Sequence, residues 1–410
     1  MTASSYNPRL RFFEASAGQQ HIAEQDRFLY AAPSAAHRVN VIGTGTIGQE
    51  HIQVAELLGR ARVNGVYDTA ERSLDIALAR LPAERRAAIV EHASLEAACQ
   101  DPDADALMIC TPNFTHLDVL ETAVKSGKPI FVEKPMATTI NDAARIVELA
   151  SQHPSFIQIG LQYRYKAAYV EARHEVLERQ SIGDVRLLTL CEYRPPFLDK
   201  VGQWNKFSRY SGGTLVEKCC HYFDLMNLFS GALPVRVYAT AGQAQNFVDF
   251  DYGGESSDID DHAHVVVDYG NGVRSAFTLS MFAPQFHEEM IISGSDGRLV
   301  TVEHFDFHRA ETAQTHLRIE RGEAGSTRDT TLSYPDLIER SGHHGATFYE
   351  HTAFVDRLEG KATDAATPIE GFWSIVVAAA AQQSAQTGQP VDIGTFLATF
   401  ALPPAVTEQL

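Results

Sequence analysis

A glycine-rich loop between a short apolar run and an amphipathic stretch limits the possible folds of this chain more than any other sequence feature. Residues 39–42 form a mostly apolar run, and Gly43-Thr44-Gly45-Thr46-Ile47-Gly48 follows it directly as G-x-G-x-x-G. Glycines permit a tight turn and let a pyrophosphate approach backbone N–H groups at a helix N-terminus, where the helix dipole favours negative charge. A plain glycine turn is the structural alternative. The residues predicted to bind a dinucleotide are Gly43, Gly45, Thr46, Ile47 and Gly48.

Asp68 ends the next apolar run, over residues 63–67, and stands twenty positions after Gly48. In dinucleotide-binding folds a carboxylate at this position accepts hydrogen bonds from the ribose hydroxyls and repels a 2′-phosphate. Asp68 therefore favours NAD over NADP. Arg72, four residues further on, is able to bind the additional phosphate, so NADP stays open as the less favoured cofactor.

Short apolar runs alternate with amphipathic stretches from Arg38 onwards, which is typical of parallel strands joined by crossover helices. After Tyr165, alternating runs meet tight turn signals instead, such as Gly270-Asn271-Gly272 between residues 262–269 and 273–281. The expected strands of the first part cover residues 39–42, 63–67, 106–110, 130–132 and 156–160, and a late apolar helix is expected over about 372–381. We predict an extension over 1–37, a doubly wound α/β domain over 38–162, and an α+β domain over 163–410 built on a large, mostly antiparallel open β-sheet.

Composition narrows the possible partners. The chain has 34 Lys and Arg residues and 52 Asp and Glu residues, so its net charge is 34 − 52 = −18. This negative charge disfavours nucleic acid and anionic membranes as binding partners. No apolar run approaches the roughly 18 to 20 residues that span a bilayer, and no apolar core of a signal peptide precedes Arg38. The five cysteines form an odd set without C-x-x-C spacing. We expect a cytoplasmic protein with reduced thiols.

Three further motifs carry a family resemblance. They are Thr111-Pro112-Asn113-Phe114-Thr115-His116, Glu133-Lys134-Pro135, and the stretch from Gly212-Gly213 to Glu217 and His221. With the glycine loop, they make the chain resemble the Gfo/Idh/MocA oxidoreductases, which include inositol dehydrogenases and glucose–fructose oxidoreductase. The resemblance implies a Rossmann domain followed by an open β-sheet domain whose exposed face builds a homodimer or homotetramer. It also implies cofactor contacts from Thr111, Asn113, His116, Glu133, Lys134 and Gln162.

Lys134, His221 and Glu217 are the candidate catalytic residues. Lys134 follows a predicted parallel strand, where doubly wound sheets place their ligand crevice, and the resemblance gives its ammonium the role of binding the reacting oxygen. On a helix starting after Gly212-Gly213, Glu217 and His221 share one face at i, i+4 spacing, so that a neutral imidazole can accept an alcohol proton beside a carboxylate. The family usually has Asp at the position of Glu217. A capping box, Thr214-x-x-Glu217, is the alternative role for this carboxylate.

The remaining candidates concern the substrate. Arg164 is able to bind substrate hydroxyls or to form an interdomain salt bridge, and both alternatives stay open. The acidic loop over 249–261 and the paired histidines lack the spacing of known metal sites, so we predict no metal. The residues expected to line a sugar pocket are Lys134, Arg164, Tyr193, Trp204, Glu217, His221 and His344, with packing the alternative for each aromatic residue and for His344.

These predictions together describe an NAD-dependent dehydrogenase that oxidises a secondary alcohol of a cyclitol, pyranose or related polyol. An NAD-dependent glycosidase of the same fold is the enzymatic alternative, and a dinucleotide-binding regulator without catalytic activity is the alternative of another class.

Overall fold

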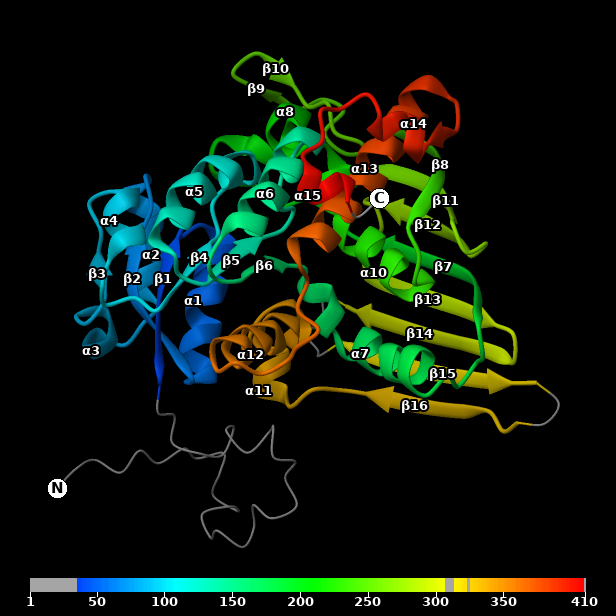
Figure 1. Ribbon diagram of the computed structural model, residues 1–410, viewed down its shortest axis with the longest axis horizontal. Coiled ribbons are helices and arrows are strands. Elements are labelled where there is room, and N and C mark those ends of the chain that lie inside the picture. The colour runs from blue at the N-terminus through cyan, green and yellow to red at the C-terminus, as the bar shows by residue number, and fades with distance from the viewer. Residues whose placement is uncertain (1–34, 307–312, 323–324, 409–410) are drawn as a thin grey trace, which may run out of the picture.

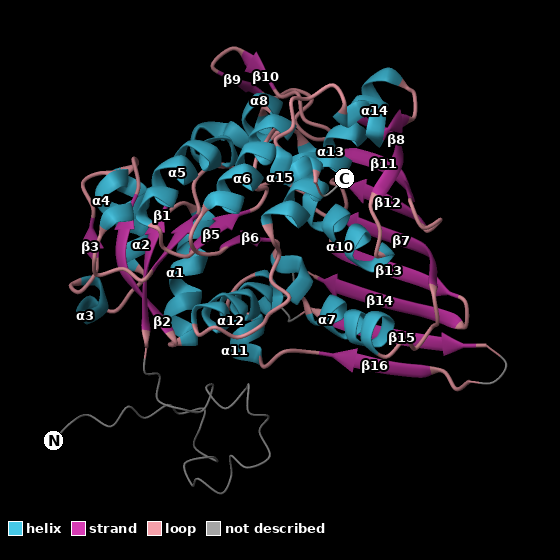
Figure 2. Cartoon of the chain, in the orientation of Figure 1, coloured by secondary structure: helices cyan, strands magenta, loops and turns pink. Residues whose placement is uncertain are grey.

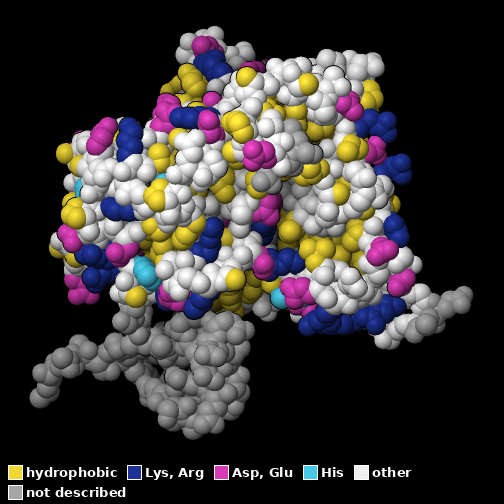
Figure 3. Space-filling view, viewed as in Figure 1, with side chains coloured by type: hydrophobic (Ala, Val, Ile, Leu, Met, Phe, Trp, Pro, Cys, Tyr) yellow, Lys and Arg dark blue, Asp and Glu magenta, His cyan; other side chains and the backbone are white. Residues whose placement is uncertain are grey.

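Two large β-sheets, a small two-stranded sheet and the helices packed on them form the protein in a computed structural model that describes residues 35–306, 313–322 and 325–408 (Figure 1). The predicted extension over 1–37 lies almost entirely outside the described residues. Within the described part of the chain, no helix is long and apolar enough to cross a membrane. Figure 3 shows acidic and basic side chains interspersed over one face of the molecule.

The first sheet is parallel and its strands follow the order β3-β2-β1-β4-β5-β6. This order is that of a doubly wound dinucleotide-binding fold, with the topological switch point between β1 and β4. The predicted parallel α/β fold is therefore confirmed. Its strands are β1 (His37–Ile42), β2 (Ala61–Tyr67), β3 (Val90–Glu91), β4 (Ala106–Ile109), β5 (Ile130–Glu133) and β6 (Ile157–Gly160). Its longer helices are α1 (Thr46–Leu58), α2 (Glu71–Ala79), α5 (His116–Ala123) and α6 (Ile140–Gln152).

The second sheet has nine strands in the order β16-β15-β14-β13-β7-β12-β11-β8-β17. All pairs are antiparallel except β7 with β12, so the predicted mostly antiparallel sheet is confirmed. Figure 2 shows helices in front of this sheet, and the alternation of buried and exposed residues along β11 agrees with one covered face. Its strands are β7 (Val185–Tyr193), β8 (Pro234–Gly242), β11 (His262–Tyr269), β12 (Arg274–Ser280), β13 (Phe286–Gly294), β14 (Gly297–Phe305), β15 (Gln314–Arg321), β16 (Arg328–Leu332) and β17 (Val391–Asp392).

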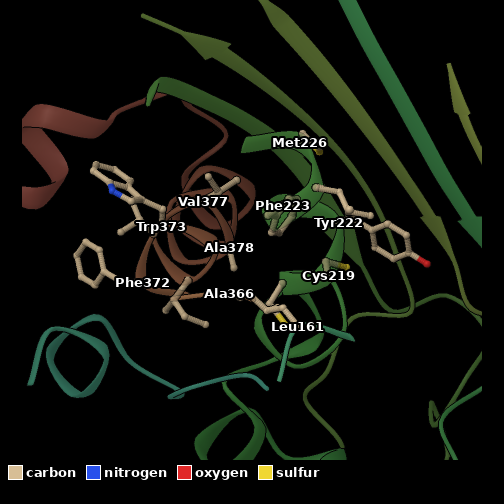
Figure 4. Packing of buried hydrophobic residues seen from close by; sticks show 14 of the residues in the cluster. Leu161, Cys219, Tyr222, Phe223, Met226, Ala366, Phe372, Trp373, Val377 and Ala378 are labelled. Atoms are coloured by element: carbon tan, nitrogen blue, oxygen red, sulfur yellow. The ribbon is translucent and has the colours of Figure 1, made fainter. Parts of the chain in front are cut away.

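Helix α13 (Pro368–Thr387) joins the two layers. It begins with a capping box between Thr367 and Glu370, and it packs against α6, against β8 and against α10 (Cys220–Ser230). The helix is apolar on most sides because both layers cover it. Figure 4 shows Val377 and Ala378 on the side of α13 toward Phe223 of α10, whereas Phe372 and Trp373 lie on the opposite side of α13 and Tyr222 points away from it.

Two other helices pack between the parallel sheet and the nine-stranded sheet. Helix α12 (Ala346–Leu358) lies against α1 and against the short helix η6 (Gln162–Tyr165). Helix α7 (Ala167–Arg173) covers β14 and β15. Residues from both halves of the chain therefore meet at the carboxyl end of the parallel sheet.

Candidate active site

Lys134 follows β5 at the carboxyl edge of the parallel sheet. Its ammonium nitrogen lies 3.2 Å from the carbonyl oxygen of Glu217 and 3.3 Å from the carboxylate Oε2 of Glu217. Its side chain is 15% exposed. Burial lowers the pKa of Lys134, but Glu217, together with Cys220 and Glu133, raises this pKa above the usual lysine value overall. Lys134 is therefore a protonated donor held between the two layers.

Glu217 lies at the end of a short helix instead of within a continuous one. The predicted single helix is two helices, α9 (Thr214–Glu217) and α10, separated by Lys218 and Cys219. The capping-box alternative is wrong, because α9 has no side-chain cap and the Thr214 hydroxyl donates to the carbonyl of Asp260. The carboxylate of Glu217 instead contacts Lys134, at the edge of the parallel sheet.

His221 lies in the first turn of α10 and is 2% exposed. Its imidazole stacks on the ring of Tyr163, with centroids 4.0 Å apart and planes 9° from parallel. Burial lowers the pKa of His221 well below the usual histidine value, and Lys134, Lys218, His343 and Lys166 lower it further. The imidazole is therefore neutral at physiological pH and is able to accept a proton.

The glycine loop has the geometry of a dinucleotide cradle. Gly43 has φ +93°, and a Cβ there would lie 2.7 Å from the backbone of Cys110, whereas a Cβ on Gly48 would lie 2.0 Å from the Gly43 carbonyl oxygen. A Cβ on Gly45 would meet no atom within 4 Å. Gly45 precedes Thr46 and Ile47 in the first turn of α1, which has no side-chain cap and no acidic residue there. Open space above an uncapped helix N-terminus fits a pyrophosphate.

Asp68 borders the same loop. Its carboxylate accepts hydrogen bonds from the backbone N–H of Thr44 at 2.7 Å, from the Thr44 hydroxyl at 3.0 Å and from the N–H of Ala70 at 2.8 Å. Asp68 thus holds the glycine loop and the start of α2 together. Arg72 is exposed in the first turn of α2.

The other residues predicted to contact a cofactor lie along the same edge but differ in what they touch. His116 is fully buried, and its two ring nitrogens lie 2.9 Å from the carbonyl oxygens of Thr111 and Pro135. Its pKa is lowered by burial. Asn113 donates to the carbonyl of Ser211 at 3.4 Å. The amide of Gln162 is buried and, among the described residues, has no hydrogen-bond partner, which fits a group that meets a ligand.

Glu133 belongs to a buried chain of hydrogen bonds behind Lys134. Its Oε2 accepts the N–H of Lys134 at 2.8 Å, and its Oε1 lies 2.7 Å from Nε2 of His51 in α1. The other nitrogen of His51 lies 2.7 Å from Nε2 of His351 in α12. The sequence analysis missed His51, although a polar residue on the apolar stripe of α1, between Ile47 and Ala55, is a usable signal.

The predicted substrate residues are only partly brought together. Arg164 pairs with both oxygens of Asp224, at 2.7 and 2.5 Å, and lies 3.0 Å from Glu370, so it forms a buried salt bridge within its own domain over 163–410 instead of the interdomain one. Tyr193 is 39% exposed and packs against His287 on the sheet face opposite Glu192. Trp204 packs on Phe114, with centroids 6.4 Å apart. His344 donates to Glu303, with 2.8 Å between Nδ1 and Oε1.

Tyr163 and Lys218 are polar residues at this site that the sequence analysis did not select. The Lys218 ammonium lies 2.5 Å from the Tyr163 hydroxyl and 3.0 Å from Glu192. On the continuous helix expected from the sequence, Lys218 would point about 100° away from Glu217. The break between α9 and α10, which has no local sequence signature, turns it into the cluster.

Comparisons with known proteins agree with this arrangement. The family model described as "Oxidoreductase family, NAD-binding Rossmann fold" matches residues 37–161, and the model described as "Oxidoreductase family, C-terminal alpha/beta domain" matches residues 174–393. Together the two models span most of the chain.

Individual relatives are more distant. An uncharacterized oxidoreductase of Bacillus subtilis is 23% identical over 86% of this chain and 95% of its own length. A myo-inositol 2-dehydrogenase of Thermotoga maritima is 25% identical over 64% of this chain and 74% of its own length. A solved levoglucosan dehydrogenase, in complex with NADH and levoglucosan, has a TM-score of 0.71 at 18% identity, covering 87% of this chain and 99% of its own. At that identity the solved structure is informative about the fold alone.

Proposed function

Because this chain belongs to the Gfo/Idh/MocA family of NAD-binding oxidoreductases, we propose that it is a dehydrogenase for a secondary alcohol of a cyclitol, pyranose or related polyol. The observation that carries the proposal is the contact of Lys134 with Glu217, 3.3 Å between charged atoms, next to a neutral, buried His221. An ammonium donor and an imidazole acceptor at the edge of a dinucleotide site are the groups that alcohol oxidation requires.

Each of the three residues has a separate task in this reaction. The neutral imidazole of His221 accepts the proton of the substrate hydroxyl. Lys134 donates a hydrogen bond to the same oxygen and stabilises the negative charge that develops on it. Glu217 holds the Lys134 ammonium in position through its carbonyl and its carboxylate. The glycine loop and Asp68 would hold NAD, which would supply the acceptor for the hydride of the carbinol carbon. The substrate is thereby converted to a ketone or a lactone.

The cofactor is NAD in preference to NADP. Asp68 stands beside the glycine loop, where its carboxylate is available to ribose hydroxyls and disfavours a 2′-phosphate. Arg72, which NADP binding would use, is exposed in the first turn of α2.

A substrate panel tests the proposal. Cyclitols, aldoses and anhydrosugars are incubated separately with NAD and with NADP, and reduction of the cofactor is followed by absorbance at about 340 nm. We expect at least one polyol to be oxidised, with NAD as the preferred acceptor. Nitrophenyl glycosides with catalytic NAD form the control panel. Release of nitrophenol without net NADH would assign the chain to the glycosidase alternative, and no turnover in either panel would contradict the proposal.

A further inference from the structure

His221 lacks the partner that usually orients a catalytic histidine. An adjacent carboxylate commonly holds one ring nitrogen of such a residue. Here the carboxylate of Glu217 is bound to Lys134, and Nδ1 of His221 is buried without a hydrogen-bond partner in the described part of the chain. What fixes the imidazole is the ring of Tyr163, which lies parallel to it at 4.0 Å.

Tyr163 is itself held on several sides. Its hydroxyl accepts a hydrogen bond from Lys218 at 2.5 Å, and Lys218 is paired with Glu192 at 3.0 Å. The ammonium groups of Lys218 and Lys166 each lie 4.6 Å from the centroid of the Tyr163 ring. Lys166 is fixed in turn by Glu288 and Glu303 on the sheet. A buried ring with this many contacts has one position, and so does the imidazole stacked on it.

The same residues set the charge around His221. Lysines approach the imidazole from the end of β5, from the break before α10 and from the segment after η6, and a histidine approaches from the loop before α12. The carboxylates near them are already paired with these lysines or with this histidine. The groups facing His221 are Lys134, Lys218, Lys166, His343 and Tyr163, with Glu217, Glu192, Glu288, Glu303 and Glu50 as the carboxylates behind them. A nearby cation disfavours protonation of the ring, so this surrounding keeps the base free.

We infer that Tyr163, anchored by Lys218, is the positioning residue for His221: its ring replaces the orienting carboxylate, and the Lys218 ammonium lies beside the stacked pair. This inference rests on the proposed function only for its catalytic consequence. The ring stack and the field of Lys218 exist independently of which alcohol is oxidised. The Tyr163 ring stacks on His221 and its hydroxyl binds Lys218, and neither Tyr163 nor Lys218 is assigned a step in the reaction.

The effect of the Lys218 charge on the titration midpoint of His221 is tested in the full-length protein. Histidine is labelled with carbon-13 at Cε1, and the His221 resonance is identified by its loss in His221→Gln. We expect its midpoint below the usual histidine value of about 6.5 in the unaltered protein, and higher by about one pH unit in Lys218→Met. Lys125→Met, which removes an exposed lysine elsewhere, is the matched control and should leave the midpoint in place. An unchanged midpoint in Lys218→Met overturns the inference.

One further variant keeps this test decisive. Should Lys218→Met fail to fold, the double variant Lys218→Met/Glu192→Gln removes the buried pair together, and a raised midpoint is again expected. The titration needs no substrate, so it stands even if the substrate panel shows no turnover. In that case the positioning inference survives and the proposed function fails.

The role of the Tyr163 ring in positioning His221 is tested by steady-state kinetics. Tyr163→Leu removes the aromatic face, so we expect kcat to fall at least tenfold while KM changes less than about twofold. Tyr163→Phe keeps the face and should retain kcat within about threefold. Wild-type kcat in Tyr163→Leu, or an equal loss in both variants, contradicts a positioning role for the ring.

Discussion

At the scale of single residues, the proposal that His221 is the base gives a clear expectation for its removal. His221→Ala should retain NAD affinity within about twofold, because the residue belongs to α10 and not to the glycine loop. Oxidation of the substrate should fall by about 10²- to 10⁴-fold, the usual contribution of a general base. Binding is measured by protein fluorescence and turnover by NADH formation. Unchanged turnover would remove His221 from the mechanism.

The pH dependence of the same residue has a defined sign. His221 acts only when it is neutral, and its pKa is well below the usual value, first because of burial and then because of Lys134 and Lys218. The pKa of Lys134 is raised, so that its ammonium persists into alkaline solution. We expect kcat/KM for oxidation to stay level as the pH falls through about 6.5 and to decline only well below it. A midpoint at the ordinary histidine value would contradict this.

Asp68 should decide the choice of cofactor. Asp68→Ser removes the charge that opposes a 2′-phosphate, and the kcat/KM ratio of NAD to NADP should fall at least tenfold. The variant also loses the carboxylate that accepts the Thr44 N–H, so some loss of NAD affinity is expected. Asp75→Ser, at an exposed position in α2, is the control. A ratio unchanged in Asp68→Ser would show that Asp68 does not select the cofactor.

The candidate site was predictable where a motif fixes both the residue and its surroundings. Lys134 and His221 stand in motifs, and the strand end and the turn around them are local structure. Tyr163 and Lys218 were missed because their roles depend on contacts between segments 55 residues apart and on a helix break. Arg164 left two alternatives open, since only the tertiary position of Asp224 and Glu370 separates them.

At the scale of elements, loss of the salt bridge between Arg164 and residues of α10 and α13 should lower the free energy of unfolding strongly. Arg164→Met leaves Asp224, 2% exposed, without its bidentate partner. We expect a loss of about 3 to 5 kcal/mol in the free energy of unfolding, measured by denaturant titration. Arg145→Met removes an arginine that is 43% exposed and paired only at the surface, and should cost about 0.5 kcal/mol or less. Equal losses would show that burial of the pair does not matter.

Elements with a strong local pattern agreed with their predictions, and the others did not. The five predicted strands of the parallel sheet are apolar along most of their length, whereas β3 has two exposed residues and no pattern to detect. The predicted helix over 372–381 is the apolar centre of α13, and the capping box at Thr367 would have located its start. The parallel pairing of β7 with β12 joins segments about 90 residues apart, and turn signals describe only neighbours in sequence.

At the scale of the whole molecule, the open face of the nine-stranded sheet is the expected surface for a homo-oligomer. A row of small and apolar side chains crosses this face in register: Tyr238, Val266, Ala276, Thr189 and Ile291. Tyr238 and Val266 are 42% and 44% exposed. Contiguous apolar surface of this kind is typical of protein interfaces.

Val266→Glu places a charge in the middle of that row and should shift the protein from oligomer to monomer. The mass in solution is measured by size-exclusion chromatography with light scattering at micromolar concentration. Val90→Glu, at an exposed valine on the edge of the other sheet, is the matched control. A wild-type protein that is monomeric, or a Val266→Glu protein with unchanged mass, would exclude this face as the interface.

Helix α13 has a consequence for how this chain is divided. One side of α13 packs on α6 and the other side packs on α10 and β8. The same helix therefore completes the hydrophobic core of both domains. Fusing the nucleotide-binding domain to another protein would remove α13 and expose the apolar surface of α6 that this helix covers. A chimaera made by exchanging one of the two domains therefore has to keep α13 together with the surfaces of both domains that it covers.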